Sequence, residues 1–209
     1  MFSDRRDAGR QLAQMVGHLS GPDTIVLGLP RGGVPVAAEV ASALAAPMDV
    51  IVVRKLGVPG HVELAMGAIG EGGVKVIHSD VVDPLGISAE EIGAVERREV
   101  IELERRVEAF RSGGEAPDIA GRQVVIVDDG IATGSTIRAA CQVARAQGAD
   151  RIVIAVPVAP FGWEQRLADV ADELICVSAP RRFGAIGAFY RDFRQTSDEE
   201  VTALLATAR

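Results

Sequence analysis

The sequence predicts an α/β fold in which helices flank a central parallel sheet. Short runs rich in Val, Ile and Ala alternate with segments of helical periodicity, which is typical of strand–helix–strand units with right-handed crossovers. Aromatic residues make up only 4% of the chain, which favours small β-branched residues in a buried parallel sheet. The length of 209 residues fits a single domain over 1–209, with an added lid and hood.

Each helix or strand expected in the first part of the chain is predicted by the pattern of apolar residues within its own segment. Residues 4–19 place apolar side chains on one face and predict an amphipathic helix, and the short apolar run 24–29 predicts the first strand. A second helical pattern follows over 36–44. The apolar run 50–53 predicts the second strand, which ends on a pair of basic residues.

The middle of the chain changes character. Residues 57–73 are rich in glycine and weakly periodic, so they predict a mobile loop or a hairpin, followed by a short strand at 74–77. Ser88 and Glu91 have the spacing of a capping box, which predicts the start of a long charged helix ending near Phe110.

The remaining elements alternate regularly. Apolar runs predict strands and amphipathic runs predict helices, and Ser197 and Glu200 have the spacing of a second capping box that predicts a last helix. The strands are expected at 124–127, 152–156 and 174–177, and the helices at 135–147 and 163–170.

Composition restricts the class of function. The formal net charge is −7, whereas general nucleic-acid-binding proteins are more often basic, so a nucleic-acid partner is disfavoured. Cys141 and Cys176 lie in apolar stretches without metal-ligand spacing and are expected to be buried, inert thiols in a reducing cytoplasm. The first residues do not resemble an apolar leader, and no apolar run is long enough to span a membrane, so we expect a cytoplasmic location and no membrane partner.

The segment from Val124 to Thr136 carries the clearest functional signal. Asp128 and Asp129 follow a buried strand, at the edge where open α/β sheets bind ligands. The next residues are small or carry hydroxyl groups, and they open a helix whose N-terminus adds positive potential. The segment therefore predicts a phosphate-binding loop over Ala132, Thr133, Gly134, Ser135 and Thr136.

The acid pair needs a partner other than the phosphate, because two carboxylates repel an anion. They fit vicinal hydroxyl groups or a nearby metal ion, and a sugar phosphate meets both demands. The plainer alternative is an acidic turn with a helix cap, which explains one acid or one hydroxyl but not the whole pattern. A nucleotide P-loop is excluded, because Gly134 is followed by Ser135 rather than by Lys. A response-regulator receiver is also excluded, because there the acid pair ends the first strand.

This segment resembles the phosphoribosyl pyrophosphate signature of type I phosphoribosyltransferases, which implies that family's fold and activity. The resemblance implies that Asp128 and Asp129 hold the ribose hydroxyls and that the loop ending at Thr136 holds the 5′-phosphate. It also implies a Mg²⁺ ion that travels with the pyrophosphate and that the two acids approach indirectly. The partners would be phosphoribosyl pyrophosphate and a small acceptor, within nucleotide metabolism, and the chain would form a homodimer, as family members often do.

A second motif, Pro30, Arg31, Gly32 and Gly33, resembles the family's pyrophosphate loop in the form found in xanthine–guanine transferases. Glycines let the backbone approach an anion closely, and Arg31 offers a fork of donors. The alternative is a tight turn with an exposed Arg. The resemblance also implies a cis non-proline peptide that either enters or leaves Arg31, and the sequence leaves this choice open.

Arg54 and Lys55 resemble the basic pair that precedes the family's flexible loop, here about 55–75, and both would reach the pyrophosphate. The loop would close over the site and exclude water. The resemblance thus assigns catalysis to Asp128, Asp129, Arg31 and Lys55.

The acceptor is expected under a hood made by the N-terminal segment and residues 180–195. Phe183 or Tyr190 would stack on an acceptor ring, or these aromatics would pack the end of the sheet. Ala132 stands where 6-oxopurine transferases carry an Asp, which argues against hypoxanthine or guanine salvage, and adenine transferases also have Ala there. A nucleobase, within purine salvage, is the expected acceptor. The alternative function is a regulator that binds phosphoribosyl pyrophosphate without catalysis.

Overall fold

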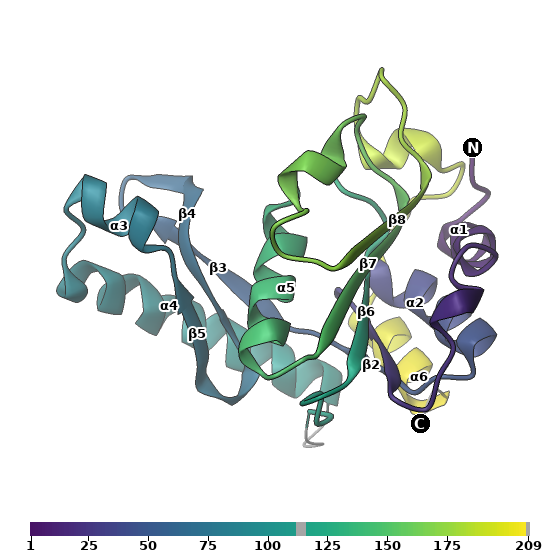
Figure 1. The fold of residues 1–209 in the computed structure, drawn as a ribbon, viewed down its shortest axis with the longest axis horizontal. Helices are drawn as coiled ribbons and strands as arrows, with labels where there is room; N and C mark the ends of the chain where they lie inside the picture. The colour runs from purple at the N-terminus through teal and green to yellow at the C-terminus, as the bar shows by residue number, and fades with distance from the viewer. Residues whose placement is uncertain (112–115, 208–209) are drawn as a thin grey trace.

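The computed structural model describes residues 1–111 and 116–207, and it is built around a five-stranded parallel sheet (Figure 1). The strand order is β2-β1-β6-β7-β8. The strands are β1 (Thr24–Gly28), β2 (Met48–Val50), β6 (Gln123–Val127), β7 (Arg151–Val158) and β8 (Glu173–Ser178). This architecture confirms the predicted α/β fold with a central parallel sheet.

Helices cover both faces of this sheet, because alternate residues of each strand are apolar on opposite sides. In β6, Val125 and Val127 pack in one core with residues of α1 (Arg5–Ala13), α2 (Gly33–Leu44) and α6 (Asp198–Thr207). Val124 and Ile126 pack on the other side against α5 (Ser135–Ala146). In Figure 1, α5 lies to the left of the central strands, and α1 and α2 lie to their right.

A second, antiparallel sheet forms most of the other lobe seen in Figure 1. Its strands are β3 (Val53–Val58), β4 (His61–Gly70) and β5 (Val74–Ile77), with η2 (Glu71–Gly73) between the last two. The glycine-rich segment is therefore a paired hairpin. At Gly57 a side chain would come within 2.7 Å of the carbonyl oxygen of Val62, which explains why glycine is needed there.

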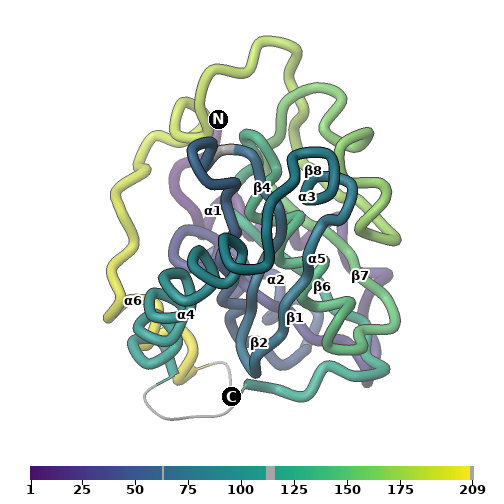
Figure 2. Tube along the Cα trace, turned by 90° about the vertical axis from the view of Figure 1, so that its left-hand side faces the viewer, coloured from purple at the N-terminus to yellow at the C-terminus, as the bar shows by residue number. Residues whose placement is uncertain are grey.

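Two helices complete this lobe, which we call the lid: residues Val53–Arg111. They are α3 (Ser79–Leu85) and the long α4 (Ala89–Arg111). The predicted capping box at Ser88 is confirmed, because the amide of Glu91 donates to the Ser88 hydroxyl at 3.3 Å and the amide of Ser88 donates to the Glu91 carboxylate at 2.9 Å. Figure 2 shows α6 beside α4, and the hydroxyl of Thr202 bonds to the carbonyl of Ala109 at 3.5 Å.

A buried ion cluster joins the lid to the central sheet. Arg111, at the end of α4, donates to Asp49 of β2 at 2.7 Å and to Glu71 at 2.7 Å. The same guanidinium donates to the carbonyl oxygen of Val50 at 2.9 Å. Because the Arg111 side chain is only 2% exposed, these contacts fix both ends of the lid at one place on the sheet.

Several boundaries differ from the predictions. The first helix ends at Ala13 and is followed by the short η1 (Gly17–Leu19). The helix predicted over 163–170 is only η3 (Trp163–Arg166), and residues near the hood form η4 (Ile186–Phe189). The predicted strand 50–53 joins the end of β2 to the start of β3, so Arg54 and Lys55 lie inside a strand of the lid rather than at the end of a central strand.

Two further expectations concern the cysteines and the membrane. Cys141 is a buried free thiol, and burial raises its pKa to about 12, as expected for an inert core residue. Cys176 is also free, and burial raises its pKa to about 11. Across the described ranges, no helix has the length and apolar character needed to cross a bilayer.

Candidate functional site

The acid pair and the Pro30–Gly33 loop, far apart in the sequence, are in direct contact at the carboxyl ends of β6 and β1. The amide of Leu29 donates to the carbonyl of Val127 at 2.8 Å. A side chain on Gly33 would come within 2.9 Å of the Asp128 Cα, and one on Gly32 would collide with the carboxylate of Asp129. Only glycine permits this close approach of the two loops, which explains why both Gly32 and Gly33 must lack a side chain.

The peptide bond between Pro30 and Arg31 is cis, so the unusual peptide enters Arg31 rather than leaving it. The Arg31 side chain extends toward α6, where Nη1 lies 3.5 Å from Asp198 Oδ1. Together with Pro30 it lines a cavity of about 490 Å³. Arg31 therefore faces the lid side of the loop, next to arginines of α4.

The two acids have different surroundings. Asp129 Oδ2 accepts a hydrogen bond from Arg5 Nε at 2.8 Å and forms an ion pair with Arg5 Nη2 at 2.8 Å. Asp128 Oδ1 accepts the backbone amide of Asp129 at 2.8 Å. Within residues 1–111 and 116–207, no hydrogen-bond partner is found for Asp128 Oδ2 or Asp129 Oδ1, so each acid keeps one oxygen for a ligand.

Burial shifts the proton affinity of the pair. It raises the pKa of Asp128 well above the ordinary value, and the negative charge of Asp129 adds to this shift. Burial also raises the pKa of Asp129, although the charge of Arg5 opposes the change. Arg5 was missed by the sequence prediction. It lies 124 positions from Asp129, and no local pattern marked it.

The predicted phosphate loop lies open at the start of α5. Gly134 has a φ of 83°, a left-handed conformation that glycine adopts without strain, and α5 begins at the next residue. The hydroxyls of Thr133 and Ser135 are 3.1 Å apart, and Ala132 and Thr136 are exposed. The amides and hydroxyls of this turn are therefore available to an anion.

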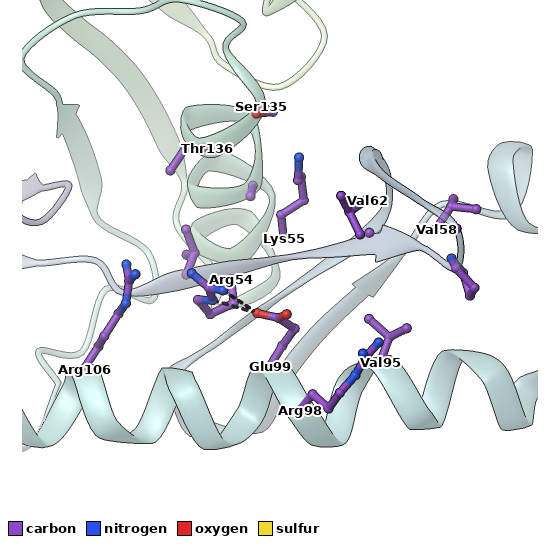
Figure 3. A pocket seen from close by; sticks show the side chains of 15 residues that line it. Arg54, Lys55, Val58, Val62, Val95, Arg98, Glu99, Arg106, Ser135 and Thr136 are labelled. Atoms are coloured by element: carbon purple, nitrogen blue, oxygen red, sulfur yellow. Dashed lines mark hydrogen bonds and ion pairs between the residues drawn. The ribbon is translucent and has the colours of Figure 1, made fainter.

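Ser135 and Thr136 line a cavity of about 550 Å³ between α5 and the lid (Figure 3). Lys55 extends from β3 into this cavity, toward the part of α5 that carries Ser135. Arg54 instead pairs with Glu99 of α4, with Nη2 2.7 Å from the carboxylate, because neighbouring strand residues point to opposite faces. The basic pair is thus divided between the phosphate loop and α4.

Two arginines of α4, Arg98 and Arg106, also line this cavity and were not predicted as site residues. Their separation of eight positions places them on one face of a helix, with Glu102 between them. That spacing is visible in the sequence. The sequence does not show that this face of α4 points toward the site, because its direction depends on how the lid packs against α5.

The aromatic residues near the C-terminus mainly hold the hood together. Tyr190 is 6% exposed, packs 5.3 Å from Phe2 and donates its hydroxyl to the carbonyl of Asp129 at 2.6 Å. The structure therefore corrects the prediction for Tyr190, whose ring is covered and cannot stack on an acceptor. Phe183 is only partly buried and stacks on Phe189 at 5.4 Å, so its acceptor role stays a prediction.

The protein donors alone do not form a metal cage. In the part of the chain that the structure describes, no group of three or more His, Cys, Asp or Glu side chains could hold a metal ion. The nearest set to the phosphate loop is the acid pair, with its two carboxylate oxygens that lack partners among those residues. Such a set suits a cation whose other ligands come from a bound phosphate.

The comparisons with known proteins agree with this geometry. The family model "Phosphoribosyl transferase domain" matches residues 5–193. The proteins "Putative phosphoribosyl transferase Rv0571c" and "Putative phosphoribosyl transferase MT0597", from two strains of Mycobacterium tuberculosis, are each 58% identical to this chain over 208 residues. The match covers 100% of this chain and 47% of theirs, so the chain spans about half the length of these relatives.

A solved structure is similar over nearly the whole fold. The crystal structure of TT1426 from Thermus thermophilus has a TM-score of 0.92 and 42% sequence identity, and the match covers 99% of this chain and 98% of that one. Because the family model extends over most of the chain and includes both loops and the acid pair, the chain belongs to the phosphoribosyl transferase domain family.

Proposed function

We propose that this chain transfers the 5-phosphoribosyl group from phosphoribosyl pyrophosphate to a nucleobase and releases pyrophosphate. The observation that carries the proposal is the contact between the Pro30–Gly33 loop and the acid pair, with the α5 phosphate loop beside them. An anion-binding turn lies on each side of two carboxylates that can accept hydrogen bonds from hydroxyl groups. This arrangement matches a ribose that carries a phosphate at one end and a pyrophosphate at the other.

The donor is held by complementary groups. The amides and hydroxyls of Thr133, Ser135 and Thr136 bind the 5′-phosphate. The carboxylates of Asp128 and Asp129 accept the two vicinal hydroxyls, one each, through the oxygens that have no partner among the described residues. Arg5 keeps Asp129 in place for this contact.

The reaction is a displacement at the anomeric carbon of the ribose. The bond from this carbon to the pyrophosphate oxygen breaks with its electron pair leaving on the pyrophosphate, and a bond to a ring nitrogen of the acceptor forms. The proton of that nitrogen is lost to solvent. Arg31 and Lys55 stabilise the charge on the departing pyrophosphate, and the ionised acid pair stabilises the positive charge that develops on the ribose.

The acid pair also fits a Mg²⁺ ion. Each carboxylate has one oxygen without a hydrogen-bond partner among the described residues, and the pair offers too few ligands for an all-protein cage, so a Mg²⁺ ion held mainly by pyrophosphate oxygens suits it. In that role Asp128 and Asp129 would approach the ion indirectly. When bound, the ion would neutralise charge on the pyrophosphate.

Ala132 and Phe183 bear on the choice of acceptor. Ala132 is exposed at the start of the phosphate loop and offers no carboxylate to a purine ring. Phe183 is the aromatic residue we propose to contact the acceptor, because it remains partly accessible while Tyr190 is covered. These features favour a nucleobase other than a 6-oxopurine.

The test is pyrophosphate release from phosphoribosyl pyrophosphate and Mg²⁺ with a panel of purines, pyrimidines and small amines. Turnover with one acceptor class, lost in Asp128→Asn and kept in the exposed control Asp83→Asn, supports the proposal. Donor binding without turnover for any acceptor supports a binding regulator instead. Failure of the wild-type chain to bind the donor contradicts the proposed site altogether.

A further inference from the structure

Two cavities beside the proposed site meet at Arg106 of α4. The first, about 550 Å³, is lined by Lys55, Ser135 and Thr136. The second, about 490 Å³, is lined by Pro30 and Arg31. Of the lining residues in the described part of the chain, Arg106 is common to both cavities. It therefore stands between the loop proposed to bind the 5′-phosphate and the loop proposed to bind pyrophosphate.

The charge of these linings is strongly positive. Among the residues that the structure describes, these linings contain six basic side chains, namely Arg31, Arg54, Lys55, Arg98, Arg105 and Arg106, and two carboxylates, Glu99 and Asp198. This concentration occurs in a chain whose formal net charge is −7. A local excess of arginine and lysine around a concave surface favours an anion with several charges.

The hydrogen bonds of Arg106 leave most of its donors available. Its Nε donates to Glu102 Oε1 at 2.9 Å. The same carboxylate also accepts two hydrogen bonds from Arg105, so one negative charge faces two guanidinium groups. Among the residues that the structure describes, neither Nη atom of Arg106 has a hydrogen-bond partner. Figure 3 shows the side chain extending from α4 toward the start of β3.

We propose that Arg106 binds the pyrophosphate group directly, as a further residue of the reaction proposed above. Its two Nη atoms form a planar fork that matches a pair of phosphate oxygens. Arg31 and Arg54 each face a carboxylate, Asp198 and Glu99, whereas Arg106 shares the carboxylate of Glu102 with Arg105, so less of its charge is neutralised. Glu102 positions the guanidinium from the preceding turn of α4. This inference rests on the proposed function.

The experiment measures the affinity of inorganic pyrophosphate with Mg²⁺ by calorimetry. We expect Arg106→Gln to weaken binding by about tenfold or more, because a charge-assisted pair of hydrogen bonds is lost. Arg106→Lys keeps the charge without the planar fork, so its pyrophosphate affinity should lie between those of wild type and Arg106→Gln. Arg97→Gln, on an exposed position of the same helix and outside both cavities, should change the affinity by less than about twofold.

A second probe separates this role from general electrostatics. Ribose 5-phosphate should bind Arg106→Gln within about twofold of wild type, because its phosphate is held by α5 amides and hydroxyls. Equal losses for pyrophosphate and ribose 5-phosphate, equal losses in Arg97→Gln, or an unchanged pyrophosphate affinity in Arg106→Gln would each overturn the proposal. Folding is not at risk, because Arg106 is 37% exposed and its ion pair is within its own helix.

The outcome also distinguishes the two proposals. If the wild-type chain turns over phosphoribosyl pyrophosphate and Arg106→Gln binds pyrophosphate as well as wild type, only the role of Arg106 is wrong. If the wild-type chain binds neither pyrophosphate nor phosphoribosyl pyrophosphate, the proposed function itself is wrong, and the inference about Arg106 is wrong with it.

Discussion

Arg5 contacts a single carboxylate oxygen of Asp129 through two nitrogens: Nε donates a hydrogen bond at 2.8 Å, and Nη2 forms an ion pair at 2.8 Å. Both side chains are 12% exposed. The third nitrogen of the same guanidinium donates to the carbonyl of Arg194 at 2.6 Å, and its plane lies 4.0 Å from the ring of Phe193. One side chain thus connects the N-terminal helix, the acid pair and the C-terminal part of the hood.

The first prediction concerns this contact. Arg5→Gln should lower the free energy of unfolding by about 2–4 kcal/mol, because it leaves Asp129 as a largely buried carboxylate without its cation. Urea denaturation measures the change. Arg6→Gln is the matched control, because Arg6 is 53% exposed and lies 3.5 Å from Glu39, and it should cost less than about 1 kcal/mol.

A double variant tests the cause. Adding Asp129→Asn to Arg5→Gln should recover part of the lost stability, since the uncompensated charge is removed. An equal or larger loss in the double variant would show that the cost comes from packing against Phe193 rather than from the ion pair.

The second prediction concerns pH. The pKa of Asp128 is raised in the folded state, so its ionised form destabilises the fold at neutral pH, while its protonated form does not at low pH. Asp128→Asn should therefore unfold at a higher urea concentration than wild type near pH 7. This advantage should shrink as the pH falls toward the ordinary range of aspartate, near pH 4.

The same variant should lose donor binding. The amide oxygen can still accept the backbone N–H of Asp129, but the NH2 group then takes the place of the second carboxylate oxygen and cannot accept the ribose hydroxyl. A gain in stability together with a loss of binding is expected of a residue kept for function. Asp83→Asn, on an exposed position, should change neither property, and a stability gain there as large as at Asp128 would contradict the argument.

The third prediction concerns the close approach of Gly32. Gly32→Ala should lower the affinity for phosphoribosyl pyrophosphate by at least about tenfold, because the new methyl group displaces the carboxylate of Asp129. Gly17→Ala is the control, because nothing lies within 4 Å of the added methyl group. Calorimetric titration of the donor measures both. A wild-type affinity of Gly32→Ala for phosphoribosyl pyrophosphate would show that the close contact between the loop and Asp129 is not needed for donor binding.

The fourth prediction concerns the ion cluster beneath the lid. Arg111→Gln should destabilise the protein by about 3–5 kcal/mol, because Asp49 and Glu71 lose a buried cation. Arg105→Gln, on the same helix but 63% exposed, should leave the free energy of unfolding nearly unchanged. Hydrogen exchange should show faster opening of β4 and β5 in Arg111→Gln only. Equal rates of hydrogen exchange in both variants would show that the ion cluster does not stabilise the lid.

The sequence predicts the parts of this fold that depend on contiguous residues. The strand before Asp128, the helix after Gly134 and the capping box at Ser88 each depend on neighbours within a few positions, and all three are present. The phosphate loop could be recognised for the same reason, because its acids and hydroxyls stand together in one segment.

Features that depend on distant residues could not be predicted. Nothing near Arg5 indicates that its partner is Asp129, and nothing in the α4 sequence shows that Arg106 faces the Pro30–Gly33 loop. The run 50–53 is buried throughout, so its hydrophobicity hides the point at which the chain leaves one sheet for the other. The covered position of Tyr190 likewise depends on Phe2, at the opposite end of the chain.

The position of Arg111 has a consequence for how this protein could vary. The lid begins at Val53, just after β2, and ends at Arg111, whose side chain bonds to the carbonyl of Val50. Entry and exit of this 53–111 unit are therefore adjacent, as in a tolerated domain insertion. Natural or engineered replacement of the unit by one of another length, with an arginine kept at its end to pair with Asp49, would leave the central strands and the acid pair in register. The lid can then change in sequence and length independently of the central sheet.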